Sequence, residues 1–127
     1  MATPAHLDTH IALWLHDVKL EKLSSRQKDL IESSDLCISE FVRLEMHYLH
    51  EIGRIKIAPD RIIANLAAHA EVAISTCPLK TLINEATKLH WTRDPFDRLI
   101  VANAQTEKAM LITHDEVILK HCRLAIG

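Results

Sequence analysis

Four acidic residues in distant parts of the chain have the types and surroundings that suit chemistry on a charged substrate: Asp8, Glu45, Asp97 and Asp115. Asp8 follows an apolar run, and Asp115 stands two residues beyond another such run. In parallel α/β sheets, ligands bind beyond the carboxyl ends of the strands, where such residues meet. Carboxylates within ~4–6 Å raise one another's pKa, and a divalent cation removes that conflict. Oxygen ligands favour Mg²⁺ or Mn²⁺, so the set points to phosphodiester chemistry.

Each of these acids also has a purely structural interpretation. Asp8 and Asp115 precede helix-like segments and suit helix caps. Asp97 falls in the first turn of a helix, where a negative charge complements the helix dipole and contributes about 0.3–1 kcal/mol. Glu45 suits an exposed helix face. The hypothesis of a site therefore depends on the whole set and not on any one member.

The stretch WTRDPFDRLIVANA, residues 91–104, places two carboxylates three residues apart. Asp94 and Pro95 have the types expected at the start of a helix, an N-cap followed by a proline in the first turn. Asp97 then lies on the helix itself, just before a strongly apolar run. We therefore expect Asp94 to begin the helix and to support the site, and Asp97 to belong to the site.

Short apolar runs alternate with longer helix-like segments along the chain. The expected strands are residues 5–8, 35–39, 71–78, 110–113 and 122–126. The expected helices are residues 9–16, 24–34, 40–55, 58–70, 79–89, 95–109 and 114–121. Serines begin the second helix, and Gly53 suits a helix end. This alternation predicts an α/β fold with a mainly parallel sheet that is covered on both faces.

Length and composition indicate a single soluble domain over residues 1–127. The net charge of −2 argues against a protein that binds nucleic acid over its whole surface, but it leaves room for a local basic rim. Cys37, Cys77 and Cys122 are far apart and form no CxxC pair, which favours buried thiols in a reducing compartment. Neither a signal peptide nor a run of ~20 apolar residues is present, so we expect a cytoplasmic location.

The segments LDTHIALWL, ISEFVRLE, DPFDRLIVANA and LITHDE occur in the order found in PIN-domain ribonucleases, from Leu7 to about Glu116. More narrowly, the chain resembles the VapC-like toxins of bacterial toxin–antitoxin pairs. This resemblance implies a three-layer α/β/α fold with a small parallel sheet. It also implies an endoribonuclease that depends on Mg²⁺ or Mn²⁺, cuts RNA, forms a homodimer and is silenced by a cognate antitoxin.

The resemblance also assigns roles to individual residues. Its metal-binding and catalytic acids correspond to Asp8, Glu45, Asp97 and Asp115, and its supporting residues correspond to Thr9, Ser39 and Thr113, to which we add Asp94. The chain departs from the family pattern in two places. Val42 and Leu44 stand where relatives often carry a serine and a tryptophan, and many relatives have an asparagine in the last motif, which makes Glu116 a second candidate beside Asp115.

Two further side chains have both a functional and a structural interpretation. Arg98 follows Asp97 and suits either a contact to substrate phosphate or an exposed helix position with an acidic neighbour. Trp14 suits either stacking on a base or packing in the core. The apolar stretches 41–49 and 62–70 suit either the core or a surface for a dimer mate or an antitoxin helix.

Three other classes of protein have acids at strand ends. A phosphoacceptor receiver domain needs an adjacent acid pair after the first strand and a lysine after the last, and LDTH and CRLAIG provide neither. A phosphatase with an aspartate nucleophile needs a DxD motif, and DTH lacks the second aspartate. A catalytically silent binding module of the same fold is the alternative that the sequence leaves open.

Overall fold

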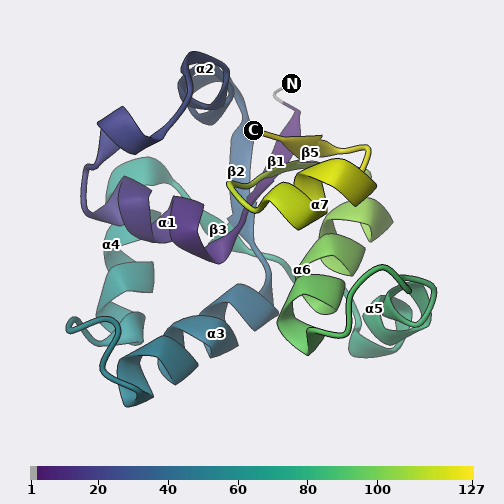
Figure 1. The fold of residues 1–127 in the computed structure, drawn as a ribbon. Coiled ribbons are helices and arrows are strands. Elements are labelled where there is room, and N and C mark those ends of the chain that lie inside the picture. Colours follow the sequence, from purple (N-terminus) through teal and green to yellow (C-terminus); the bar gives the residue numbers. More distant parts are fainter. Residues whose placement is uncertain (1–2) are drawn as a thin grey trace.

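The computed structural model describes residues 3–127 and shows one five-stranded sheet with helices on both faces (Figure 1). The strands are β1 (Pro4–Leu7), β2 (Asp35–Ile38), β3 (Ala73–Ile74), β4 (Met110–Ile112) and β5 (Ala125–Ile126). They lie in the order β3-β2-β1-β4-β5, and every neighbouring pair is parallel. The predicted α/β/α fold with a small parallel sheet is confirmed.

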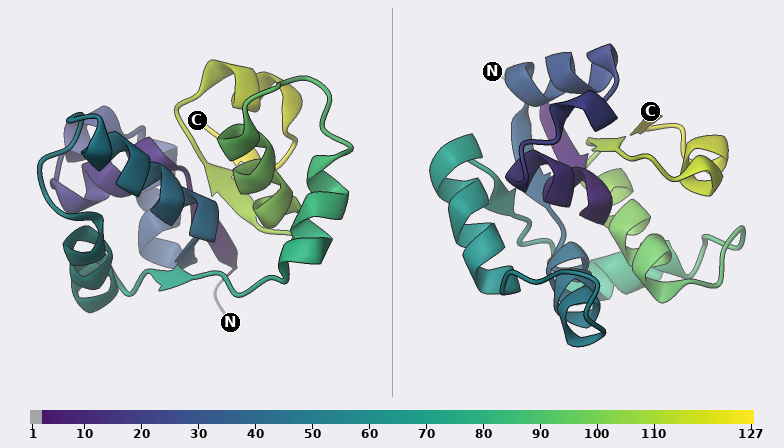
Figure 2. Two further views of the ribbon diagram at one scale, coloured as in Figure 1. Left: turned by 90° about the horizontal axis from the view of Figure 1, so that it is seen from below. Right: turned by 60° about the vertical axis from the view of Figure 1, so that its left-hand side comes forward.

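Seven α-helices fall within the described residues. They are α1 (Thr9–His16), α2 (Ser25–Ser33), α3 (Glu40–Glu51), α4 (Pro59–Ala70), α5 (Leu79–Ala86), α6 (Pro95–Thr106) and α7 (Glu116–His121), with a short 3₁₀ turn at Leu20–Lys22. Helices α1, α2 and α4 lie on one side of the sheet and α5, α6 and α7 on the other, with α3 below the sheet in Figure 1. Figure 2 shows the same layers from two further directions.

The elements follow the predicted ranges closely, and the differences have local causes. The predicted strand 71–78 is only two residues long: the Ser75 N–H still donates to the carbonyl of Ile38 in β2 at 2.8 Å, and the chain then turns toward Pro78, which begins α5. The last helix begins at Glu116, later than predicted, because Asp115 caps it. Helix α3 ends where Gly53 adopts a φ of 79°, a left-handed conformation that favours glycine.

Ser24 and Gln27 fix the start of α2 and its position on the sheet. The two residues form a reciprocal capping box, in which the Ser24 hydroxyl accepts from the Gln27 N–H and the Gln27 side chain accepts from the Ser24 N–H. The buried Gln27 amide also donates to the carbonyls of Thr113 at 3.0 Å and Ile126 at 3.2 Å. One side chain thus joins α2 to the carboxyl ends of β4 and β5.

The core is built from the apolar residues of the sheet and of the helix faces that cover it. Leu7, Ile38, Leu111 and Ile112 come from the strands, and all are at most 1% exposed. Burial of a side chain of this size contributes about 1.5–3 kcal/mol each. Helix α6 is the most enclosed, with five consecutive residues buried from Ile100 to Ala104. No helix within residues 3–127 is long and apolar enough to cross a bilayer.

The connections of the sheet place a crevice beside β1. The chain moves from β1 to β2 on one side and later enters β4 on the other, so the strand order changes direction between β1 and β4. Ligands of open α/β sheets bind at the carboxyl ends of the strands at such a point. The Asp8 N–H donates to the carbonyl of Ile112 at 3.0 Å, which holds Asp8 beside the end of β4.

Candidate active site

A cavity of about 410 Å³ opens at this point of the sheet and gathers acidic side chains from across the chain. It is lined by Asp8, Glu45, Asp94, Asp97 and Asp115, together with His10, Trp14 and His114. All four of the predicted metal-binding acids therefore meet in one pocket, which we call the acid pocket. The junction between β1 and α1, helix α3, the start of α6 and the loop after β4 each contribute at least one carboxylate.

Asp8 is the most enclosed of the acids, with 9% of its surface exposed. Its Oδ1 accepts from the Thr9 N–H at 2.8 Å, and its Oδ2 accepts from the Thr113 hydroxyl at 2.6 Å. Burial raises the pKa of Asp8, and the hydrogen bonds from Thr113 and Thr9 oppose that rise. Asp8 thus caps α1, as its structural interpretation predicted, and it also presents a fixed carboxylate to the pocket.

Glu45 reaches the pocket from the middle of α3 and is tied to the Asp8 region by a hydrogen bond. The hydroxyl of buried Thr9 donates to Glu45 Oε1, while the Thr9 backbone holds Asp8. Burial is the main reason that the pKa of Glu45 is raised, and Asp8 adds to the rise. Thr9 therefore orients two carboxylates at once, which agrees with its predicted supporting role.

Asp94 and Asp97 differ in their hydrogen bonds, in the way that the sequence predicted. Asp94 Oδ1 accepts from the Phe96 N–H at 2.8 Å and from the Asp97 N–H at 3.2 Å, so Asp94 caps α6 with Pro95 in the first turn. Asp97 is half-buried, and within residues 3–127 no hydrogen bond or ion pair to its side chain is present. Burial first, and then the charge of Asp94, raises the pKa of Asp97 to about 7.

Asp115 lines the pocket while it caps α7. Its Oδ1 accepts from the Val117 and Ile118 N–H groups at 2.8 and 3.2 Å, and its own N–H donates to the Thr113 hydroxyl at 3.1 Å. The buried Thr113 hydroxyl thus connects Asp8 to Asp115. Glu116, the second candidate for this place, is exposed in the first turn of α7 and does not line the pocket.

Four of the predicted residues lie outside the pocket lining: Thr9 and Thr113, whose hydrogen bonds hold the acids, and Ser39 and Arg98. Ser39 is fully buried, caps α3 and accepts from the Phe41 N–H at 3.1 Å, so it supports the helix that carries Glu45. Arg98 packs between α5 and α6, where its Nε donates to the carbonyl of Ala86 at 3.2 Å. The structure does not bring Arg98 among the carboxylates, and its contact to substrate phosphate stays a prediction.

Two histidines and Trp14 complete the lining, and sequence reasoning did not assign the histidines to the site. The Trp14 and His114 rings lie edge to face with their centroids 5.1 Å apart, and the His10 and Trp14 centroids are 6.3 Å apart. Trp14 also packs against the core, as its structural interpretation predicted, while stacking on a base stays a prediction. In the sequence, each histidine is next to a predicted site residue: His114 precedes Asp115 in LITHDE, and His10 follows Thr9 in LDTH. These neighbours were the available signals for the two histidines.

The residues of the acid pocket fit a hard divalent cation. Five carboxylates line it, and no lysine or arginine does. The hydroxyl and backbone donors hold Asp8, Glu45 and Asp94 in place but do not neutralise their charge. A carboxylate whose pKa is raised by burial and by like charges is stabilised by a cation. Oxygen donors of this kind suit Mg²⁺ or Mn²⁺, with Asp8, Glu45, Asp97 and Asp115 as the candidate ligands.

A second polar group lies on the sheet away from this pocket, at His6, Cys37 and Glu107, whose potential donor atoms lie within 4.8 Å of one another. Here Glu107 Oε1 already has three partners: His6 Nε2 at 2.7 Å, the Ser75 hydroxyl at 2.8 Å and the Asn103 amide at 2.9 Å. Burial also raises the pKa of the Cys37 thiol to about 11, which opposes the thiolate that a metal requires. We interpret this group as a hydrogen-bond network and call it the Glu107 network.

Comparison with known families identifies the chain. The family model of the PIN domain matches residues 5–124. The chain belongs to the PIN-domain family. PIN domains are generally nucleases, and the acid pocket lies where the resemblance placed the metal-binding acids. No curated protein sequence matches the chain.

Two solved structures share the fold of this PIN domain. One is a chain of VapBC2 from Rickettsia felis bound to a DNA fragment from its promoter, with a TM-score of 0.68 and 19% identity over 98% of this chain and 96% of that one. The other is a chain of a toxin–antitoxin complex from Klebsiella pneumoniae, with a TM-score of 0.63 and 16% identity over 97% of this chain and 96% of that one. The predicted resemblance to VapC-like PIN domains is confirmed at the level of the family and the fold.

Proposed function

We propose that this PIN domain is a metal-dependent endoribonuclease that cleaves phosphodiester bonds in RNA and acts as the toxin of a toxin–antitoxin pair. The observation that carries the proposal is the acid pocket: five carboxylates at the carboxyl edge of a parallel sheet, with no basic side chain among them. Such a pocket repels a phosphate unless a cation joins the two. This requirement favours a nuclease over a module that only binds RNA through basic residues.

The side chains of the pocket prepare it for that chemistry. Asp8, Glu45, Asp97 and Asp115 would hold one or two ions, and Thr9 and Thr113 fix the first two acids by hydroxyl donation. A bound Mg²⁺ or Mn²⁺ supplies Lewis acidity at a phosphate oxygen and lowers the pKa of water. In the metal-free pocket Asp97 holds a proton at its carboxylate up to a pH of about 7, because its pKa is raised to about 7. Loading of the site therefore releases that proton.

The proposal includes a protein partner and a second copy of the chain. The two similar structures are described as VapBC2 and as a toxin–antitoxin complex, which supports a cognate antitoxin for this chain as well. Leu44, Tyr48 and Ile52 form a line along α3, each about half exposed at 54%, 49% and 50%. Apolar residues four apart lie on one helix face, so this face suits the predicted homodimer.

The test is RNA cleavage by the purified protein with and without Mn²⁺ or Mg²⁺. We expect cleavage only with the ion, and we expect Asp8→Asn and Asp97→Asn to abolish it while circular dichroism stays unchanged. Glu116→Gln, an exposed acid one residue beyond the pocket, is the matched control and should cleave normally. Cleavage that persists in EDTA or in both aspartate variants would contradict the proposal. Metal binding without any turnover would instead favour the catalytically silent module.

A further inference from the structure

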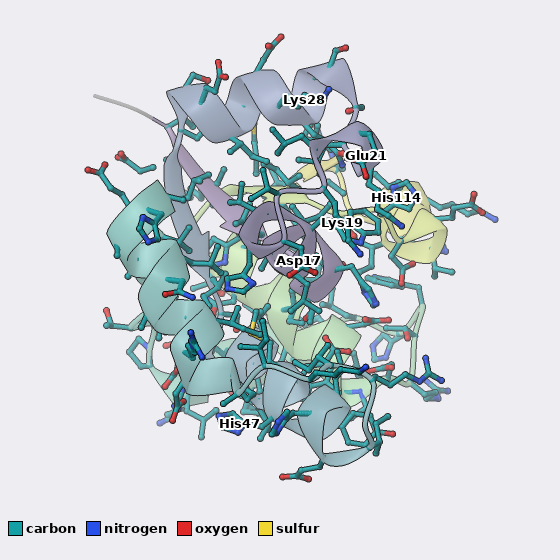
Figure 3. The ribbon with its side chains drawn as sticks, turned by 90° about the vertical axis from the view of Figure 1, so that its left-hand side faces the viewer. Asp17, Lys19, Glu21, Lys28, His47 and His114 are labelled. Carbon is teal, nitrogen blue, oxygen red and sulfur yellow. The ribbon has the colours of Figure 1, made fainter. Side chains whose placement is uncertain are left out.

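A groove of about 520 Å³ opens directly beside the acid pocket and shares two of its walls. His10 and Trp14 line both cavities. The groove continues from there between α1, α3 and α4 and is closed by the loop 52–58. Its entrance lies on the side of the molecule seen in Figure 3, where Asp17 and Lys19 mark the end of α1 and the chain beyond it.

The groove has an apolar floor and a basic rim. Leu49, Ile55, Ile57 and Ile62 provide apolar walls opposite Trp14. Three cations, Lys19, Arg54 and Lys56, stand at the rim, and all three are exposed. Within the described chain none of the three forms an ion pair. The acid at the rim, Asp17, pairs instead with His16 at 3.2 Å.

Backbone hydrogen bonds hold the rim in place before any ligand binds. The Lys19 N–H donates to the carbonyl of Trp14 at 2.9 Å, which folds the end of α1 over the groove. The Arg54 N–H donates to the carbonyl of Leu49 at 2.8 Å, which turns the loop after α3 back toward the groove. The cations are thus carried by segments whose backbone is already fixed, which lowers the entropic cost of binding.

We propose that the groove binds the nucleotide that flanks the scissile phosphate in a single-stranded segment of RNA. Its base packs against Trp14 and the isoleucines, and its phosphate lies among Lys19, Arg54 and Lys56. The proposal rests on the proposed function, because it takes the acid pocket to be where the strand is cut. It adds the residues that bind the flanking nucleotide and the side from which the strand enters.

Charge and shape both favour this occupant over a protein segment. A nucleotide presents a negative phosphate beside an apolar ring, and the groove presents unpaired cations beside an apolar floor with an aromatic wall. A paired base in a duplex has its faces covered by its neighbours, so only an unstacked base can reach Trp14. The geometry therefore selects a loop, an overhang or an unpaired strand.

The test is equilibrium binding of a fluorescein-labelled single-stranded RNA of about ten nucleotides, a length within the usual site sizes. Anisotropy is measured in Mg²⁺ buffer at several salt concentrations, with Asp97→Asn in all proteins to prevent cleavage. The groove variant is Arg54→Ala with Lys56→Ala. The matched control is Arg26→Ala with Lys28→Ala, which removes the same charge from exposed residues of α2, where Figure 3 shows Lys28.

Each phosphate contact to a single strand contributes about 0.7 to the slope of log affinity against log salt. Because Arg54 and Lys56 share one phosphate in this proposal, the groove variant should lose up to about 0.7 from that slope, and at 0.1 M salt it should bind roughly fivefold more weakly. The control should keep the slope and the affinity. Trp14→Leu should weaken binding by about tenfold with little change of slope, because it removes stacking and no charge. Its unfolding temperature is measured alongside, since Trp14 also packs on the core.

Three results would contradict the proposal that the groove binds a nucleotide of single-stranded RNA. They are an unchanged salt slope in the groove variant, an equal loss of affinity in the control, and equal affinity for a duplex of the same sequence. These results are separate from failure of the proposed function, which shows as cleavage that survives Asp97→Asn. If the protein never cleaves RNA but its RNA binding depends on the groove, the nucleotide site in the groove is supported and the nuclease function is rejected. Displacement of the RNA by a peptide alone, with no effect of Arg54 or Lys56 on RNA binding, would assign the groove to a protein partner.

Discussion

Strand β1 leads to two polar groups that have opposite electrostatic character. His6, within the strand, belongs to the Glu107 network, in which one carboxylate oxygen accepts three hydrogen bonds of 2.7–2.9 Å. Asp8, just past the strand, belongs to the acid pocket, in which five carboxylates share hydroxyl and backbone donors but no cation. In the first group the protein alone supplies the partners of the Glu107 carboxylate, although the buried His6 Nδ1 has no partner within residues 3–127. The second is complete only when a cation is added.

This difference indicates that the Glu107 network serves the stability of the fold and that the acid pocket serves function. Burial lowers the pKa of His6 despite its hydrogen bond to Glu107. The network therefore pairs a neutral imidazole with a carboxylate that is partly exposed to solvent. Burial raises the pKa of Asp8, Glu45 and Asp97 together, so the acid pocket costs the fold free energy near neutral pH. Proteins keep such an unfavourable group where it serves a site. Substitutions in the two groups should therefore have opposite effects on folding.

The largest expected effect comes from substituting the two carboxylates of the DPFD segment one at a time and comparing the loss of cleavage. Asp97→Asn should reduce cleavage by about a thousandfold or more, since a metal supplies several kcal/mol of transition-state stabilisation. Asp94→Asn keeps a side-chain oxygen that caps α6, so it should reduce cleavage by about tenfold at most. The measurement is kcat/KM on one RNA with saturating Mn²⁺. Equal losses in the two variants would show that Asp94 holds the metal as well.

The second effect concerns the Glu107 network and should appear in stability alone. Glu107→Ala leaves the buried His6 and Asn103 donors without their acceptor and should lower the free energy of unfolding by about 2 kcal/mol. Glu107→Gln keeps an acceptor oxygen and should cost less than half of that. Urea denaturation measures both, and cleavage by the folded variants should match the wild type. A large loss of cleavage by folded Glu107→Gln would contradict the separation of the two groups.

The sequence predicted the acid pocket well because its acids lie next to element boundaries. Asp8 directly follows β1 and Asp115 stands three residues beyond the end of β4, and the alternation of strands and helices places such ends on one edge. The same residues also cap helices, so the structural interpretation of Asp8 and Asp115 is confirmed, while their role at a metal ion stays a prediction. Glu45 was included because it lies about one and a half turns into the helix after the second strand, from where it could reach back to that edge. Its contact with Thr9 could not be predicted from its local spacing.

The Glu107 network and the role of Arg98 were beyond sequence reasoning for a physical reason. His6 and Glu107 are 101 positions apart in the chain, and each stands in a segment with no recognisable motif. Their pairing follows from how α6 packs on the sheet, which periodicity does not determine. Arg98 follows Asp97 directly, yet neighbours on a helix point about 100° apart, so its guanidinium contacts α5 instead. Strand β3 was predicted at residues 71–78, but it is shorter, because an edge strand pairs with only one neighbour, and only Ala73 and Ile74 pair with β2.

A smaller effect is expected from the hydroxyl that joins Asp8 to Asp115. Thr113 is fully buried, donates to Asp8 and accepts from the Asp115 N–H. Thr113→Val keeps the shape and removes that link, so affinity for Mn²⁺ should fall about tenfold. Thr106→Val is the control, because the buried Thr106 hydroxyl has no hydrogen-bond partner within residues 3–127. Calorimetric titration with Mn²⁺ measures both, and an equal loss in the two variants would contradict the role of Thr113.

The smallest effect is a pH dependence that the acid pocket gives to the metal-free protein. Because the pKa of Asp97 rises from 3.8 to about 7 on folding, the folded state keeps a proton that the unfolded state releases. Asp97 therefore stabilises the fold less and less as the pH rises from about 4 through 7. Solvent screens this half-buried group, which reduces the difference to about 1 kcal/mol.

The measurement compares unfolding of the wild type and Asp97→Asn in EDTA at pH 5 and at pH 8, so that all other titrating groups cancel. We expect the variant to gain stability over the wild type at pH 8 relative to pH 5. Mg²⁺ should then stabilise the wild type more at pH 8 than at pH 5, because the ion binds the ionised carboxylate. A constant difference between the two proteins at both pH values would show that Asp97 is ionised throughout. The carboxylates of the acid pocket would then be ionised without a cation at no cost to folding, and the contrast with the Glu107 network would be lost.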